Sequence, residues 1–288
     1  MAVAQVKVAL VTGGASGIGL AVVQALSARG GWQIHIVDIK ENPGELPPTC
    51  FYHRADTTAY NDLADAFRAA FEAGGKRLDF LFANAGIFER GNWYSPSASA
   101  GEPPPEPDWS ALETNLKGCM NTVRIGRYYM AQSPRPDKGS IVVTGSVAGI
   151  WPSYFSPMYT ASKHGVVGFM RSVAESYYTF DNIRINALCP SIVRTEILPD
   201  EVWDRLPKDA FTPLEIITKV VLMFIDGETI TDSRDKTASK VYGQTVVPSS
   251  NRFYLNEVPD YCDEIHRALT EGTHVAHMGD ALERKETL

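Results

Sequence analysis

The N-terminal part of the chain contains the pattern that most constrains the fold. An apolar, β-branched segment, Val6–Thr12, runs directly into the glycine-rich turn Gly13-Gly14-Ala15-Ser16-Gly17-Ile18-Gly19, and a helical pattern over Ile18–Arg29 follows. Glycine permits a tight turn and a close approach of backbone to ligand, while the N–H groups and the dipole of a helix N-terminus attract anions. This order of strand, turn and helix predicts the first unit of a parallel sheet, with a phosphate-binding site at the turn.

The rest of the chain continues to alternate between short apolar strands and helical patterns. Further strands are expected at Gln33–Val37, Thr49–His53, Leu78–Ala83, Ser140–Thr144, Ile183–Leu188 and Val241–Val247, and further helices at Tyr60–Ala73, Trp109–Ala131, Pro157–Tyr178 and Pro213–Ile225. Continuous apolar strands between helices are typical of a parallel sheet that is covered on both faces. We therefore expect an α/β fold: a single doubly wound, Rossmann-type domain with about seven parallel strands and helices on both faces.

Three stretches depart from this alternation. Phe88–Asp108 is rich in Ser, Pro and Gly, which predicts a solvated loop insertion or, alternatively, a pocket rim or dimer contact. Glu196–Phe211 is partly apolar, and is either a substrate lid or an ordinary surface helix. The tail over residues 256–288 is polar with one short helical pattern, so we expect a peripheral helix followed by disorder.

Charge, cysteines and hydropathy argue against several classes of protein. Lys and Arg total 27 against 34 Asp and Glu, and the resulting net charge of −7 disfavours nucleic-acid binding. The cysteines are scattered and no histidines cluster, so neither a metal site nor a disulfide framework is expected. No apolar run approaches the ~18 residues of a membrane span, and the N-terminus lacks the pattern of a secretory signal. We expect a cytoplasmic protein.

Asp38 ends the second expected strand, about twenty residues beyond the glycine-rich turn. A carboxylate at this place accepts hydrogen bonds from the ribose hydroxyls of a dinucleotide and repels a 2′-phosphate. No Arg follows Asp38 and position 14 is Gly, although Lys40 is nearby. These residues favour NAD over NADP as the cofactor of a dinucleotide-binding domain over residues 1–255.

Tyr159 and Lys163 are four residues apart within an expected helix, so both side chains project from one face. An unperturbed Tyr titrates at about 10 and is protonated at neutral pH. A fixed positive charge nearby favours the phenolate, and we therefore expect Lys163 to lower the pKa of Tyr159 and make it a general base. An exposed helix face is the alternative for the pair taken alone.

With Thr12–Gly19, Asn84-Ala85-Gly86, Asn115, Ser146, Tyr159 and Lys163 in this order, residues 6–250 resemble the short-chain dehydrogenase/reductase family. Within that family, the segments from Tyr159 to Phe169 and from Ile185 to Pro190 are most similar to the NAD-dependent 15-hydroxyprostaglandin dehydrogenase group, which oxidises a secondary alcohol on a lipid-like substrate. That group carries a Gln where this chain has Phe155-Ser156-Pro157, so prostaglandin itself is doubtful as a substrate.

The resemblance implies a role for each member of a catalytic set. Tyr159 would exchange the proton of the substrate hydroxyl, and Lys163 would hold ribose hydroxyls and lower the Tyr pKa. Ser146 would hydrogen-bond the substrate oxygen. Asn115 would open its helix locally and hold a water that links Lys163 to solvent.

The expected binding residues complete the site. Cofactor contacts are expected from Gly13, Ser16, Gly17, Ile18, Gly19, Asp38, Asp56, Asn84, Gly86, Tyr159, Lys163, Pro190, Ile192 and Thr195. Asp56 has a simple helix cap as its alternative. Substrate contacts are expected from Ser146, Trp151, Tyr154, Ser156 and Trp203, and no metal is expected.

These residues lead to one main hypothesis and two alternatives. The main hypothesis is an NAD-dependent oxidoreductase that interconverts a bulky apolar secondary alcohol and its ketone, as a homodimer or homotetramer. The alternatives are a ketone reductase of a biosynthetic pathway with the same site, and a non-catalytic dinucleotide-binding scaffold.

Overall fold

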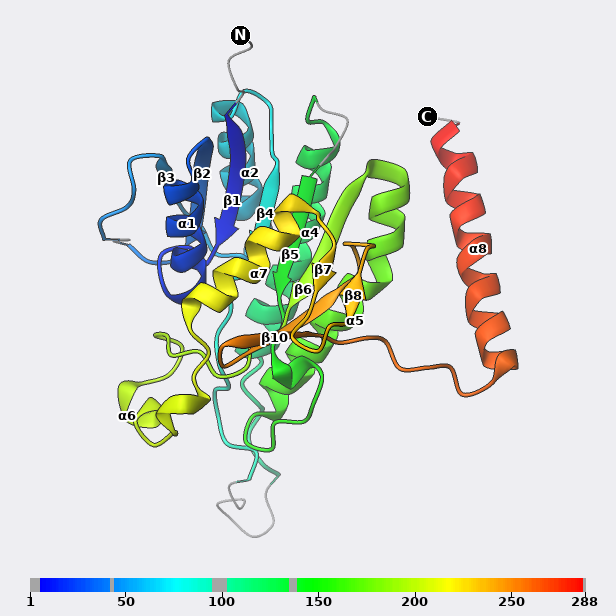
Figure 1. Cartoon of the computed structure of the whole chain (residues 1–288). Helices are drawn as coiled ribbons and strands as arrows, with labels where there is room; N and C mark the ends of the chain where they lie inside the picture. The colour runs from blue at the N-terminus through cyan, green and yellow to red at the C-terminus, as the bar shows by residue number, and fades with distance from the viewer. Residues whose placement is uncertain (1–5, 42–43, 95–102, 135–138, 287–288) are drawn as a thin grey trace.

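The computed structural model describes residues 6–41, 44–94, 103–134 and 139–286, and within them an eight-stranded sheet lies between two layers of helices (Figure 1). The order across the sheet is β10-β9-β6-β5-β4-β1-β2-β3. β10 runs antiparallel to β9, and the other strands pair in parallel, which confirms the doubly wound fold. The strands are β1 (Lys7–Thr12), β2 (Trp32–Asp38), β3 (Cys50–Arg54), β4 (Phe80–Ala83), β5 (Gly139–Thr144), β6 (Ile183–Leu188), β9 (Thr245–Ser249) and β10 (Arg252–Leu255).

The strand order reverses direction next to β1. The chain builds β1, β2 and β3 outward on one side and then crosses to place β4 on the other side of β1. The loops that leave β1 and β4 therefore diverge to opposite faces and open a crevice at the carboxyl ends of the strands. In sheets of this type the crevice is where ligands bind.

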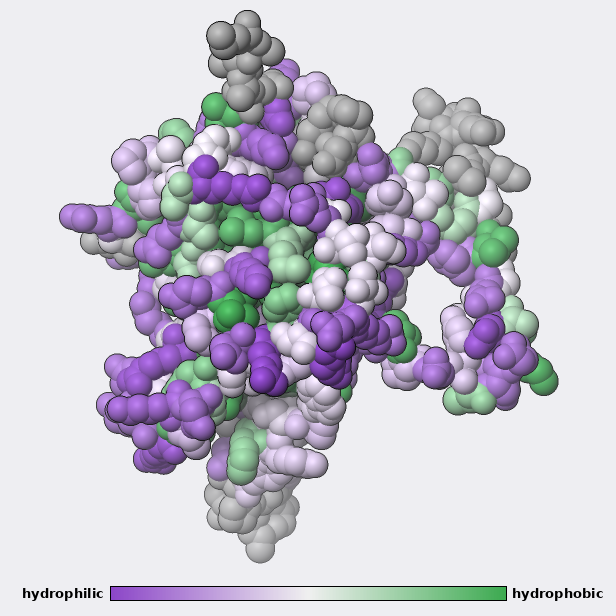
Figure 2. Space-filling model, in the orientation of Figure 1, coloured by the Kyte–Doolittle hydropathy of each residue, from purple (hydrophilic) through white to green (hydrophobic). Residues whose placement is uncertain are grey.

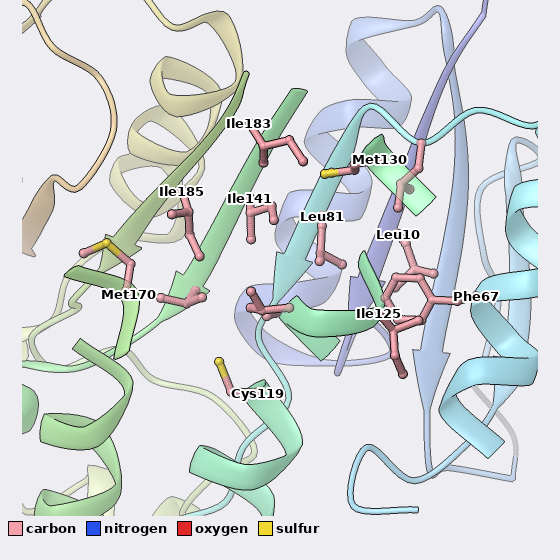
Figure 3. Packing of buried hydrophobic residues seen from close by; sticks show 14 of the residues in the cluster. Leu10, Phe67, Leu81, Cys119, Ile125, Met130, Ile141, Met170, Ile183 and Ile185 are labelled. Atoms are coloured by element: carbon pink, nitrogen blue, oxygen red, sulfur yellow. The ribbon is translucent and has the colours of Figure 1, made fainter. Parts of the chain in front are cut away.

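Each face of the sheet carries its own apolar core. One core packs the sheet against α1 (Gly17–Arg29) and α7 (Leu214–Asp226), and the other packs it against α2 (Tyr60–Ala73), α4 (Cys119–Ala131) and α5 (Pro157–Asp181). Figure 3 shows the second core, in which Leu10, Leu81 and Ile141 of the sheet face Phe67 and Met170 of the helices. Alternate residues of a strand thus serve opposite layers, as strand geometry requires.

The helix expected at Trp109–Ala131 is present, but it is not a uniform α-helix. A short α3 (Ser110–Leu112) passes into a π-helical turn (Glu113–Gly118) before α4 begins. Such wider turns are uncommon and often mark functional sites. This turn contains Asn115, and it matches the local opening of the helix that we expected there.

The C-terminal third differs most from expectation. The last parallel strand begins at Thr245 instead of Val241, because residues before it turn at Gly243 (φ +69°). The hairpin β9–β10 and the small ribbon of β7 (Ile230–Thr231) and β8 (Thr237–Ala238) were not expected. Residues 95–102 of the expected loop insertion and the final residues 287–288 lie outside the described parts of the chain.

The tail contains a helix longer than the short one expected, α8 (Glu264–Glu286, 23 residues). Figure 1 shows it beside the domain at the end of an extended segment, and the Ser176 hydroxyl of α5 donates to Met278 Sδ at 3.6 Å. Figure 2 shows that hydrophilic residues predominate on α8 and on the face of the domain in view. None of the helices in the described parts of the chain is long and apolar enough to cross a bilayer.

Candidate active site

A cavity of about 1550 Å³ opens at the carboxyl ends of the parallel strands. Its walls come from the loops that follow β1, β2, β3, β4, β5 and β6, and from the start of α5. The cavity therefore lies at the crevice where the strand order reverses. Most of the residues expected from the sequence to bind or catalyse line it, but Gly19, Asn115, Tyr154 and Ser156 do not.

The glycine-rich turn forms a cradle that larger residues would fill. Gly13 and Gly17 have φ values of +64° and +51°, and a Cβ on Gly19 would lie 2.1 Å from the carbonyl oxygen of Gly13. Ser16, the residue before α1, makes no side-chain cap to the helix, and Ser16, Gly17 and Ile18 line the cavity. The turn therefore combines a close backbone with a helix N-terminus, an arrangement that fits the phosphates of a dinucleotide.

The side chain of Asn84 holds together the strand ends that form the crevice. Its amide nitrogen donates to the carbonyl oxygens of Thr12 and Gly13 at 3.2 and 3.3 Å, and its amide oxygen accepts from the Thr144 hydroxyl at 3.0 Å. One side chain thus joins the ends of β1, β4 and β5. Asn84 and Gly86 both line the cavity, as expected.

Asp38 lies at the end of β2 with its carboxylate directed to the crevice. One oxygen accepts from the N–H of Ala15 at 3.1 Å and the other from the N–H of Lys40 at 3.2 Å. The Lys40 ammonium forms an ion pair of 2.7 Å with Glu196, which comes from the loop after β6. The cation nearest to Asp38 in sequence is therefore already engaged by a carboxylate.

Asp56 does not cap α2, because the N-cap of that helix is Ala59 and has no side-chain cap bond. The Asp56 carboxylate accepts from the N–H of Thr58 at 2.8 Å and thereby shapes the turn before α2, and the residue also lines the cavity. Farther along the cavity, Pro190, Ile192 and Thr195 form the wall contributed by the loop after β6. Thr195 lies against the glycine-rich turn, since a Cβ on Gly17 would be 3.1 Å from it.

Asn115 is 1% exposed and its side chain is fully engaged. The amide oxygen accepts from the N–H of Ile87 at 2.8 Å, and the amide nitrogen donates to the Ile87 carbonyl at 2.9 Å and to the Ser162 hydroxyl at 3.0 Å. A Cβ on Gly86 would lie 3.0 Å from the Asn115 amide oxygen and 3.5 Å from the Lys163 ammonium. Glycine at position 86 therefore leaves room for both side chains against the backbone.

Tyr159 and Lys163 both line the cavity, but they do not interact as expected. The Lys163 ammonium donates to the Thr144 carbonyl at 2.8 Å, and burial lowers its pKa from 10.5 to about 8. Burial also raises the pKa of the Tyr159 phenol, although hydrogen bonding to the Ser146 hydroxyl acts in the opposite direction. The expected lowering of the Tyr159 pKa by Lys163 is thus wrong for this structure. Burial of the phenol is the largest influence on its pKa, and the Lys163 ammonium, 5.6 Å from the ring centre, donates to the Thr144 carbonyl instead.

Aromatic and aliphatic side chains form the wall beyond Tyr159. Trp151 and Trp203 line the cavity as expected, together with Phe88, Phe155 and Leu206. The expected contacts from Tyr154 and Ser156 are absent from the lining. Tyr154 is 75% exposed and Ser156 is fully buried, because the turn closed by the Ser156 N–H on the Ser153 carbonyl (3.2 Å) directs the first outward and the second inward.

Glu89 lies in the cavity wall and was not anticipated from the sequence. Its carboxylate accepts hydrogen bonds from the N–H groups of Tyr159 at 2.7 Å and Met158 at 3.3 Å. No signal in the sequence pairs it with a segment almost seventy positions away. In the described parts of the chain, no group of three or more His, Cys, Asp or Glu side chains is arranged to hold a metal ion.

Both the sequence and the fold of the chain resemble those of known proteins. A family model described as short chain dehydrogenase matches residues 7–205. The chain is 40% identical over 282 residues to the short-chain dehydrogenase/reductase prx7 of Penicillium rubens, covering 92% of this chain and 99% of that protein. It is 34% identical over 203 residues to 15-hydroxyprostaglandin dehydrogenase (NAD(+)) of Homo sapiens, covering 67% of this chain and 70% of that enzyme. The crystal structure of gox2181 matches with a TM-score of 0.62 at 26% identity, covering 76% of this chain and 88% of that one.

Proposed function

Since the chain belongs to the short-chain dehydrogenase/reductase family of oxidoreductases, as its motifs predicted, we propose that it uses NAD to interconvert a bulky apolar secondary alcohol and its ketone. One observation carries the proposal: Tyr159, Ser146 and Lys163 lie in a single cavity between a glycine-rich phosphate cradle and an aromatic wall. A polar groove for a dinucleotide and an apolar pocket for a substrate therefore adjoin the same phenol.

The residues along the groove fit a nicotinamide dinucleotide. The cradle at Gly13–Gly19 would bind the phosphates, and Asp38 would bind a ribose. The wall at Pro190–Thr195 would bind the nicotinamide end of the cofactor. Asp38 disfavours a 2′-phosphate by charge, and Lys40 is paired with Glu196, which supports NAD over NADP. When bound, the nicotinamide would accept or supply the hydride.

The side chains beside the pocket would transfer the proton of the substrate hydroxyl. Tyr159 would donate a proton to the ketone oxygen or remove it from the alcohol, while the Ser146 hydroxyl would hydrogen-bond that oxygen. Lys163, whose ammonium donates to the Thr144 carbonyl at 2.8 Å, would hold a cofactor ribose. Asn115, which like Lys163 lies against Gly86, would hold the loop after β4 in place through its bonds to Ile87.

The raised pKa of Tyr159 bears on how the rate in each direction depends on pH. Burial keeps the phenol protonated at neutral pH, which is the form that ketone reduction requires. Oxidation requires the phenolate, so its rate should rise with pH. A reductase with the same site is accordingly the second candidate function.

The apolar wall indicates the kind of substrate. Trp151, Trp203, Phe88, Phe155 and Leu206 surround the pocket beyond Tyr159. Pockets lined mainly by aromatic side chains with a few polar groups bind bulky apolar ligands oriented by one polar atom. Here that atom would be the reacting oxygen at Ser146 and Tyr159.

Replacing Tyr159 with Phe tests the proposal. Turnover of a panel of secondary alcohols and ketones would be followed as NADH absorbance, and cofactor binding by fluorescence titration. We expect turnover to fall about 10²-fold or more with NAD binding retained, because only the transferable proton is lost. Near-full turnover in the variant would refute the mechanism, and cofactor binding without turnover by the unaltered protein would instead support a scaffold.

A further inference from the structure

The helix that carries Tyr159 and Lys163 starts in an unusual way. The first N–H groups of a helix have no partner inside the helix and are commonly satisfied by the side chain of the preceding residue. Before α5 that residue is Ser156, but it makes no cap, and its hydroxyl pairs with the Ser153 hydroxyl at 2.7 Å. Glu89, from the loop after β4, supplies acceptors for the N–H groups of Tyr159 and Met158 instead.

We propose that Glu89 is a positioning residue that fixes Tyr159 in the cavity by capping α5 from a neighbouring loop. The inference rests on the proposed function, in which Tyr159 exchanges a proton with the substrate. A carboxylate at a helix N-terminus forms charge-assisted hydrogen bonds and interacts favourably with the helix dipole. Glu89 is bonded to the backbone of Tyr159, so it acts on where the phenol lies and does not touch the reacting atoms.

The neighbouring residue Phe88 also contacts Tyr159, through its side chain. The two rings lie 4.9 Å apart between centres at an angle of 44°, so Phe88 packs on the side chain while Glu89 bonds the backbone. Both contacts come from one dipeptide. A shift of this loop would therefore move the ring and the start of the helix together.

The loop itself is anchored to the other polar residues of the site. Asn115 grips both backbone groups of Ile87 and donates to the Ser162 hydroxyl, which in turn donates to the Tyr159 carbonyl at 2.7 Å. These bonds and the chain from Ile87 to Glu89 form a closed circuit from Asn115 to Tyr159 and back. In such a circuit Glu89 is the link that fixes the helix N-terminus to the loop.

The test compares Glu89→Ala with Glu89→Gln and with a cap elsewhere. We expect Glu89→Ala to lower kcat about 10- to 100-fold, since a displacement near 1 Å at a reacting group has effects of this order, with the Kd for NADH unchanged because the groove is intact. Glu89→Gln keeps one acceptor oxygen and should recover most of the loss. Asp263→Ala is the matched control, because Asp263 accepts from the His266 N–H at 2.7 Å at the start of α8, far from Tyr159, and kcat should not change.

Each outcome either supports or overturns the positioning role of Glu89. Unchanged kcat in Glu89→Ala, or a fall in kcat explained by lost NADH binding or by unfolding at the assay temperature, overturns the positioning role. If Glu89→Ala does not fold, Glu89→Gln decides: a fall of a few-fold in kcat at constant Kd supports the role, and unchanged kcat overturns it. Full turnover in Tyr159→Phe overturns the proposed function itself, whereas an inactive Tyr159→Phe beside a fully active Glu89→Ala overturns only the role of Glu89.

Discussion

Replacing Asn115 with alanine should destabilise the whole domain as well as its active site. The substitution removes three hydrogen bonds of 2.8–3.0 Å made by a side chain that is 1% exposed. A buried hydrogen bond contributes about 1 kcal/mol net, so we expect a loss of about 3 kcal/mol in the free energy of unfolding. That is a large fraction of the roughly 5–15 kcal/mol typical of a domain, and corresponds to a fall in Tm of about 6–12 °C.

Asn121→Ala is the matched control for this measurement. Asn121 lies on the same continuous helix, is of the same residue type and donates one side-chain bond, to the Thr57 carbonyl at 3.1 Å. We expect a loss of about 1 kcal/mol from it. Urea unfolding followed by tryptophan fluorescence would compare both variants with the unaltered protein. If Asn115→Ala loses no more stability than Asn121→Ala, the amide does not stabilise the fold in the way we infer.

Three further predictions follow from the site. Glu196→Gln should release Lys40 from its 2.7 Å ion pair and improve the Kd for NADP by about 2- to 5-fold, on the scale of one exposed charge contact. Fluorescence titration would measure this gain, which should vanish in a double variant with Lys40→Ala. Between pH 8 and 10.5, Lys163 is largely deprotonated in the folded protein but still protonated in the unfolded chain. The contribution of Lys163 to the free energy of unfolding should therefore rise with pH through this window. Urea titrations at several pH values should show that Lys163→Met lacks this rise. Gly19→Ala should abolish dinucleotide binding because its Cβ would clash with the backbone of the turn, whereas Gly168→Ala, with no atom within 4 Å of the new Cβ, should bind normally in the same titration.

Local patterns made the fold and much of the cavity predictable. The glycine-rich turn, Asp38 and the pair Tyr159 and Lys163 depend on spacing within one element, and a strand end or a helix face brings such residues to the same edge of a parallel sheet. The β9–β10 hairpin turns at Ser250, which has a φ of +50°, and is held by the antiparallel pairing of its two strands. That pairing is a tertiary property that local spacing does not reveal.

The features missed in the site are also tertiary. Glu89 meets Tyr159 only because the loop after β4 passes the start of α5. The raised pKa of Tyr159 reflects how deeply the fold buries its phenol, and burial depends on residues from several loops. Tyr154 looked like part of the aromatic wall, but a turn before α5 directs it outward. Spacing along the chain indicates which residues share an element, whereas contacts between loops decide what each side chain faces.

The junction made by Asn84 has a consequence for how the protein opens and binds. Because one amide ties the ends of β1, β4 and β5, none of these strands can separate locally without breaking its bonds to the others. The floor of the cavity should therefore open only with the cooperative unfolding of the sheet centre, and its backbone amides should be among the slowest to exchange with deuterium. Since this part of the site is ordered before any ligand arrives, binding loses little conformational entropy there.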